Sequence, residues 1–142
     1  MSPAIPDLWP PDFGTSSQPS PASILRQQAH LLGQRTRNVV VGEIESKSEG
    51  RGRFLHQFVL AAPLLDFRQP LLHIRHGVEV YPVELAVYDD SGAHVVNISA
   101  VNSEQFMSAL KSHLAAERIV RLVRSLVDQC RDPDDRPEDA GA

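Results

Sequence analysis

The stretch RFLHQFVLA, residues 53–61, decides the fold because both of its faces carry apolar side chains. In a β-strand successive side chains point to opposite faces of the sheet. Phe58 and Leu60 therefore share one face, and Leu55 and Val59 share the other. A strand that is apolar on both faces is typical of the interior of a sheet. We expect residues 53–61 to form a central strand.

A second strand is expected directly before this stretch. The β-branched run at 39–41 and Ile44 are typical of a strand over 38–48. Residues 48–52, SEGRG, are rich in glycine and form a turn signal. The two strands should therefore pair as a hairpin.

Downstream patterns predict the rest of an antiparallel meander. The apolar alternation changes register at Pro82, which predicts a bulge or bend there. The stretch DDSG at 89–92 is a hairpin turn signal, and 63–70 is expected to be a connection. The expected strand segments are 71–75, 78–88 and 94–101.

Helix signals flank this strand region. Ser20 and Pro21 form an N-cap and a first helical residue, and apolar residues recur at helical spacing from there to Gly33. Asn102 and Gln105 resemble a capping box that begins a second helix. The apolar stripe then changes phase near 115–117, which predicts a kink or a third helix. The fold class is therefore α+β: an N-terminal helix, an antiparallel β-meander of four to five strands, and two C-terminal helices packed on one face.

The two ends of the chain differ from the middle in composition. Residues 1–20 contain five prolines, which favour an extended arm. Residues 131–142 contain five acidic residues and almost nothing apolar, so we expect this tail to be disordered. The expected organisation is an arm at 1–20, a single α+β domain at 21–130 and an acidic tail at 131–142.

Composition and charge exclude some classes of protein. The formal net charge of −4 argues against a surface built throughout for nucleic acid. The single cysteine, Cys130, cannot form an intrachain disulfide or a thiolate cluster. No window approaches the length of a membrane-spanning helix, and no basic, apolar leader begins the chain. We therefore expect a cytoplasmic protein with no membrane partner, no cofactor and no metal.

Three residues outline a possible ligand cleft. His73 and His76 lie three residues apart, close to Tyr81, and an imidazole can act as a base or a ligand. On one strand, however, His73 and His76 point to opposite faces, so a shared site requires the chain to turn at Gly77. The alternative is that both are ordinary structural or surface histidines.

A basic ridge is also possible on the last helix. Arg118, Arg121 and Arg124 fall three apart, and such a ridge can hold phosphates. Its alternative is a solvated helix face paired with acids, because the aromatic side chains that would stack on bases are absent nearby.

The arm carries the least expected residues. Leu8, Trp9 and Phe13 lie among prolines, ahead of any segment that can fold by itself. Large apolar side chains are costly to leave in water, so these should dock somewhere. They either cover the arm's own domain or insert into another subunit or a partner.

Several stretches together give a resemblance that spans residues 8–128. The chain resembles a set of small uncharacterised bacterial proteins that share a Leu-Trp-Pro-x-Asp arm and a Pro-x-x-Ile-Leu-x-x-Gln-Ala-x-Leu-Leu-Gly helix. Here the arm reads Pro-Pro-Asp where that set has a Pro-acidic pair. That set has no established activity, so the resemblance assigns no role to any position. The matching stretches are LWPPD at 8–12, PASILRQQAHLLGQRTRNVV at 21–40 and YPV at 81–83.

The leading hypothesis is a non-enzymatic, self-associating protein–protein interaction module that uses the aromatic arm and an apolar face of the sheet or last helix. It predicts a homo-oligomer or a protein partner and no catalytic residues. The alternative is a small enzyme or ligand-binding protein that uses the histidine cleft. A third hypothesis is weak nucleic-acid binding by the arginine ridge, which would make affinity fall steeply with salt.

Overall fold

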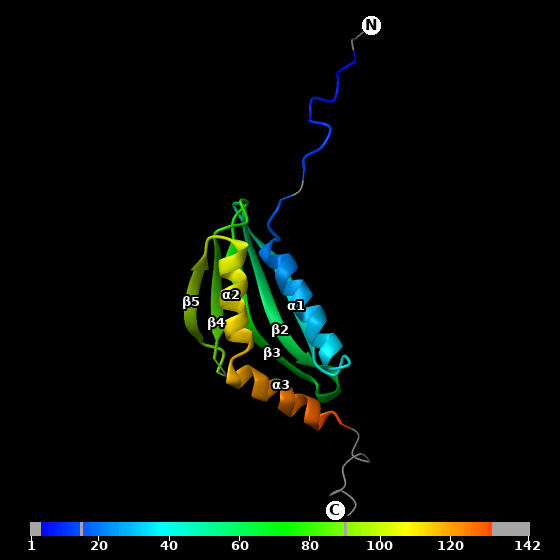
Figure 1. The fold of residues 1–142 in the computed structure, drawn as a ribbon, viewed down its shortest axis with the longest axis vertical. Coiled ribbons are helices and arrows are strands. Elements are labelled where there is room, and N and C mark those ends of the chain that lie inside the picture. Colours follow the sequence, from blue (N-terminus) through cyan, green and yellow to red (C-terminus); the bar gives the residue numbers. More distant parts are fainter. Residues whose placement is uncertain (1–3, 15, 90, 132–142) are drawn as a thin grey trace, which may run out of the picture.

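The computed structural model describes residues 4–14, 16–89 and 91–131. Within these residues the chain forms one five-stranded sheet and three α-helices (Figure 1). The fold is α+β, with an antiparallel meander between one N-terminal and two C-terminal helices, as the sequence predicts. The elements are α1 (Pro21–Arg35), β1 (Val41–Gly50), β2 (Arg53–Ala62), the 3-10 helix η1 (Pro63–Leu65), β3 (Phe67–His76), β4 (Val83–Tyr88), β5 (His94–Ala100), α2 (Ser103–Leu114) and α3 (Glu117–Gln129).

The sheet has the strand order β1-β2-β3-β4-β5, and every neighbouring pair is antiparallel. β2, which contains the stretch at 53–61, pairs with a strand on each side, and β3 occupies the middle of the sheet. β3 begins at Phe67, inside the segment expected to be a connection. A register shift between Phe58 and Val59 brings Pro70 opposite Val59. Such an irregularity accommodates a proline, which has no N–H for the ladder.

The segment 78–82 is a turn, although a strand was expected there. Val80 has a φ of 76°, in the left-handed region that β-branched residues rarely adopt, and its N–H donates to the carbonyl oxygen of Gly77 at 2.9 Å. The Tyr81–Pro82 peptide bond is cis. The bend expected at Pro82 is therefore present, and it separates β3 from β4.

The predicted helix signals act as expected. The hydroxyl of Ser20 accepts from the backbone N–H of Ser23, and the side chain of Asn102 accepts from the N–H of Gln105. α2 ends at Leu114 and α3 begins at Glu117, where the apolar stripe changes phase. These caps satisfy N–H groups that a helix start leaves without partners.

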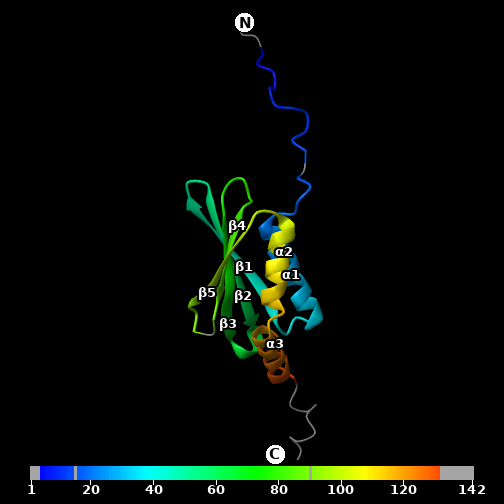
Figure 2. The same ribbon diagram turned by 60° about the vertical axis from the view of Figure 1, so that its left-hand side comes forward.

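All three helices lie against one face of the sheet (Figures 1 and 2). Phe58 pairs with Leu72 and Ile74 pairs with Leu85 across neighbouring strands; all four side chains point to this face and are buried in the core beneath the helices. The opposite face carries charged pairs, among them Arg68 with Glu43 at 3.3 Å. The core therefore forms between the sheet and one layer of helices. No helix in the described part of the chain has the length and apolarity needed to cross a membrane.

A glycine sets how closely α1 approaches the sheet. α1 packs mainly on β1, and a Cβ atom built on Gly42 would come within 2.8 Å of both Ala29 Cβ and Phe58 Cζ. Real Cβ atoms do not approach other heavy atoms this closely. Ala29 itself is buried and small, so helix and strand meet here at nearly backbone distance.

We expect Gly42→Ala to lower the free energy of unfolding by about 1–2 kcal/mol. The added methyl group overpacks a filled contact, which outweighs the small gain from replacing a glycine in a strand. Urea unfolding of the variant checks this. Lys47→Ala, at an exposed site on the same strand, is the control, and equal stability of Gly42→Ala and the unsubstituted chain would contradict the prediction.

Candidate functional site

The N-terminal arm is exposed along its described length and runs away from the domain (Figures 1 and 2). The exposed fractions of Leu8, Trp9 and Phe13 are 84%, 72% and 76%. The rings of Trp9 and Phe13 lie 5.6 Å apart at an angle of 53°, which is a favourable tilted aromatic pair. The arm thus presents two aromatic rings together without covering its own domain.

Two local hydrogen bonds shape the arm around these rings. The carboxylate of Asp7 accepts from the backbone N–H of Trp9 at 3.1 Å, and that of Asp12 accepts from Gly14 at 2.8 Å. Side chains that bond two residues ahead in this way form Asx turns, which fix the direction of a short segment. The two carboxylates therefore lie on either side of Trp9 in the sequence, and Asp12 directly precedes Phe13.

The base of the arm is fastened to the domain. The side-chain oxygen of Gln18 accepts from the N–H of Ser103 at 2.8 Å, and the hydroxyl of Tyr81 donates to the carbonyl oxygen of Pro19 at 2.8 Å. Burial raises the pKa of the Tyr81 phenol. Tyr81 thus holds the arm's base, rather than lining a cleft with the histidines.

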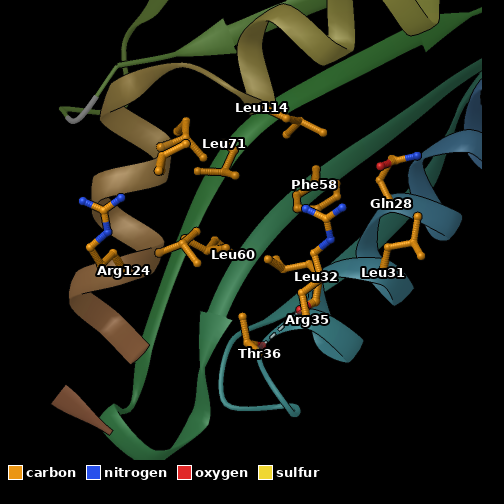
Figure 3. Close-up of a pocket in the computed structure, with 13 residues that line it drawn as sticks. Gln28, Leu31, Leu32, Arg35, Thr36, Phe58, Leu60, Leu71, Leu114 and Arg124 are labelled. Atoms are coloured by element: carbon orange, nitrogen blue, oxygen red, sulfur yellow. Dashed lines mark hydrogen bonds between the residues drawn. The ribbon is translucent and has the colours of Figure 1, made fainter. Parts of the chain in front are cut away.

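A groove of 460 Å³ opens on the helix side of the molecule, between α1 and α3 (Figure 3). Its floor is formed by Phe58 and Leu60 of β2 and by Leu71 of β3. This volume is within the range of about 300–1,000 Å³ typical of ligand pockets. Most of the side chains that line it are apolar: Leu31, Leu32, Phe58, Leu60, Leu71, Leu114, Ile119, Val120 and Val123.

Two arginines border this apolar groove. Arg35 comes from the last turn of α1 and Arg124 from α3, so the two contribute to opposite walls (Figure 3). Both side chains are exposed, and neither forms an ion pair with any other residue that the structure describes. The groove therefore combines an apolar floor with unneutralised positive charge at its margins.

The three residues of the possible ligand cleft do not converge on one point in the structure. His73 points to the outer face of the sheet, where its Nδ1 contacts the hydroxyl of Tyr88. His76 points to the helix face, where its Nε2 lies 3.1 Å from Nε2 of His56. With Tyr81 bonded to the arm's base, the three residues proposed for one cleft make three separate sets of contacts.

His56 and His76 belong to a hydrogen-bonded chain that the sequence did not indicate. Nδ1 of His76 lies 2.9 Å from the carbonyl oxygen of Gly77 and must donate to it, so its Nε2 accepts from the Nε2–H of His56. Nδ1 of His56 then accepts from the hydroxyl of Ser46, 2.7 Å away. Both ring nitrogens of His56 are thus engaged in hydrogen bonds within the domain. Over the residues that the structure describes, no three His, Cys, Asp or Glu side chains are placed to hold a metal ion together.

The three arginines of the last helix are divided among different contacts. Arg118 donates to the carbonyl oxygen of Tyr88 at 2.8 Å and joins α3 to the sheet. Arg121 pairs with Glu117 at 3.7 Å, and Arg124 lines the groove. The three side chains of the possible ridge therefore make three different contacts.

The groove was not foreseen from the sequence. Its lining comes from α1, β2, β3, α3 and the end of α2, and no local motif marks it. The nearest signal in the sequence is the apolar stripe of α3, which includes Ile119, Val120 and Val123; in the structure Val120 of this stripe stays exposed.

The chain was compared with protein-family models, with curated proteins and with solved structures, and none of the three comparisons found a match.

His56 predicts that stability depends on pH. Burial, followed by the nearby His76 and Arg26, lowers the pKa of His56 below its usual value. The unfolded chain therefore binds a proton more readily than the folded chain, and stability decreases as the pH falls below about 6.5. Urea unfolding between pH 7.5 and pH 5 should show this decrease.

His56→Gln should reduce that pH dependence, because it removes the buried imidazole. His30→Gln, at an exposed position on α1, serves as the control and should leave the dependence in place. A profile that is equally steep with and without the imidazole of His56 would refute this assignment.

Proposed function

We propose that this chain is a non-enzymatic protein–protein interaction module that self-associates and acts in the cytoplasm, and that the arm at 4–14 makes the contact. The observation that carries the proposal is the exposed aromatic pair of Trp9 and Phe13 on an arm that its own domain leaves uncovered. The single cysteine is in keeping with a cytoplasmic protein.

Energetics support a binding role for the arm. Burying one large apolar side chain contributes about 1.5–3 kcal/mol, and association must also offset the loss of conformational freedom. The Asx turns and the tilted pair of rings restrict the arm before it binds, which lowers this cost. A preorganised aromatic pair is typical of the few residues that dominate an interface.

The surfaces available to receive the arm differ in chemistry. The outer face of the sheet carries ion pairs, such as Arg68 with Glu45 at 3.5 Å and Arg75 with Glu49 at 3.0 Å. Charged side chains are depleted at the centre of interfaces. The helix side, which contains the apolar groove, is therefore the better candidate of the two faces.

The first test is the native molar mass, measured by light scattering over a concentration series. We expect the full-length chain to form a defined oligomer, and a chain without residues 1–16 to remain monomeric. Trp9→Ala with Phe13→Ala should weaken association by at least about 100-fold, because each of the two rings contributes about 1.4 kcal/mol or more.

Leu64→Ala with Val78→Ala is the matched control, since both side chains are large, apolar and exposed but lie outside the arm. This control should associate like the unsubstituted chain. If removal of the arm or of its rings leaves the molar mass unchanged at every concentration, the proposal fails.

A further inference from the structure

We infer that the groove between α1 and α3 receives the N-terminal arm of a second copy of this chain. This inference rests on the proposed function and names the surface that the arm engages. Two features of one chain lack a partner in the described structure, namely an exposed aromatic arm and an apolar groove with a positive margin. Their apolar surfaces, their charges and their positions fit each other.

The apolar surfaces match in kind and size. The groove has a floor of Phe58, Leu60 and Leu71 and a volume of 460 Å³, which is room for a drug-sized ligand. Trp9 and Phe13, held side by side, are an occupant of that order. Docking would also cover Val120, which is 41% exposed on the wall of the groove.

The charges are complementary. Arg35 and Arg124 stand on the two walls of the groove, whereas Asp7 and Asp12 lie on either side of Trp9 in the arm. None of these four side chains forms an ion pair within the described part of the chain. An arm that enters the groove therefore brings its carboxylates toward the arginines, and opposite charges also guide two surfaces into register.

The acidic tail does not match the groove in the same way. Residues 132–142 carry acidic groups, but their only apolar residues are alanine and proline. A segment of this composition can neutralise arginines but cannot fill a cavity floored by phenylalanine and leucine. The arm supplies both properties.

Position favours the groove of another copy over the arm's own. The arm is fastened at Gln18 and Pro19, beside the start of α1, whereas Leu31 and Arg35 place the groove near the end of α1. These points are about 20 Å apart at 1.5 Å of rise per helical residue. The arm leaves its base in the opposite direction (Figure 1). To reach its own groove the arm would have to reverse its direction, and Phe13, which lies only a few residues before Gln18, could span at most about 18 Å of that distance. The groove of a second copy requires no reversal.

A charge-exchange experiment tests this pairing. The groove variant combines Arg35→Glu with Arg124→Glu, and the arm variant combines Asp7→Arg with Asp12→Arg. In either variant the arm and the groove carry charges of the same sign, so they repel each other. Each variant alone should therefore associate at least about 10-fold more weakly than the unsubstituted chain. In a mixture every arm meets a groove of opposite charge, so mixing the two variants should restore the oligomer. All four side chains are exposed, so the substitutions leave the core intact.

Two readouts follow the arm directly. Molar mass by light scattering reports association, and the emission of Trp9, the only tryptophan, reports whether the arm is buried. For the unsubstituted chain we expect the emission to shift to shorter wavelength as concentration and molar mass rise together. Val120→Asp should suppress both changes, whereas Met107→Asp, equally exposed at 42% but outside the groove, should not.

The failures of this inference and of the proposed function are distinguishable. If removal of the arm abolishes association while the charge and Val120 variants behave like the unsubstituted chain, the arm binds elsewhere and only this inference is overturned. Buried emission from a monomer at every concentration would show that the arm docks on its own domain, which overturns both this inference and the proposed self-association. A monomer with water-exposed emission throughout would overturn both.

Discussion

The width of the sheet relative to its helices is the constraint on which the rest of this structure depends. Five strands spaced about 4.8 Å apart present a surface roughly 20 Å wide, which two helices of about 10 Å diameter can just cover. α1 and α2 start close together and diverge toward their ends, and α3 crosses beyond them (Figure 1). Because the helices diverge, the floor formed by β2 and β3 stays partly open. The groove is thus a consequence of how three helices cover five strands.

The close contact between α1 and β1 fixes this arrangement. Gly42 and Ala29 allow the helix to lie almost against the strand, which anchors α1 over one side of the sheet. α2 packs on β5 at the other side. α1 and α2 thus cover the two edges of the sheet. The apolar residues of α3 cover one end of the sheet, where Ile119 and Leu126 are buried. The helix layer is therefore complete at the edges of the sheet and thin over its middle strands.

The arm and the groove lie at opposite ends of α1. Because of this separation we propose that the arm of one copy meets the groove of another copy. Hydrogen bonds from Ser103 and Tyr81 hold the arm's base at the start of α1 and set the direction in which the arm leaves. A chain that carries a binding segment at one end and a matching groove at the other can join copies by a closed exchange or by an open series. The charged outer face of the sheet adds little apolar surface to such an assembly.

Local sequence signals are sufficient to predict the order and type of most elements of this fold. These signals are the apolar pattern in 53–61, the glycine-rich turn before it, and the helix caps at Ser20 and Asn102. Each depends only on residues that are close together in the sequence, so it can be recognised without the tertiary structure. The start of β3 at Phe67 was missed because a cross-strand irregularity accommodates Pro70. Only the tertiary structure decided which side chains meet. The arm's exposure, the pairing of His56 with His76, and a groove lined from five elements depend on contacts between residues far apart in the chain. No local pattern records such contacts, because they arise when helices and strands pack together.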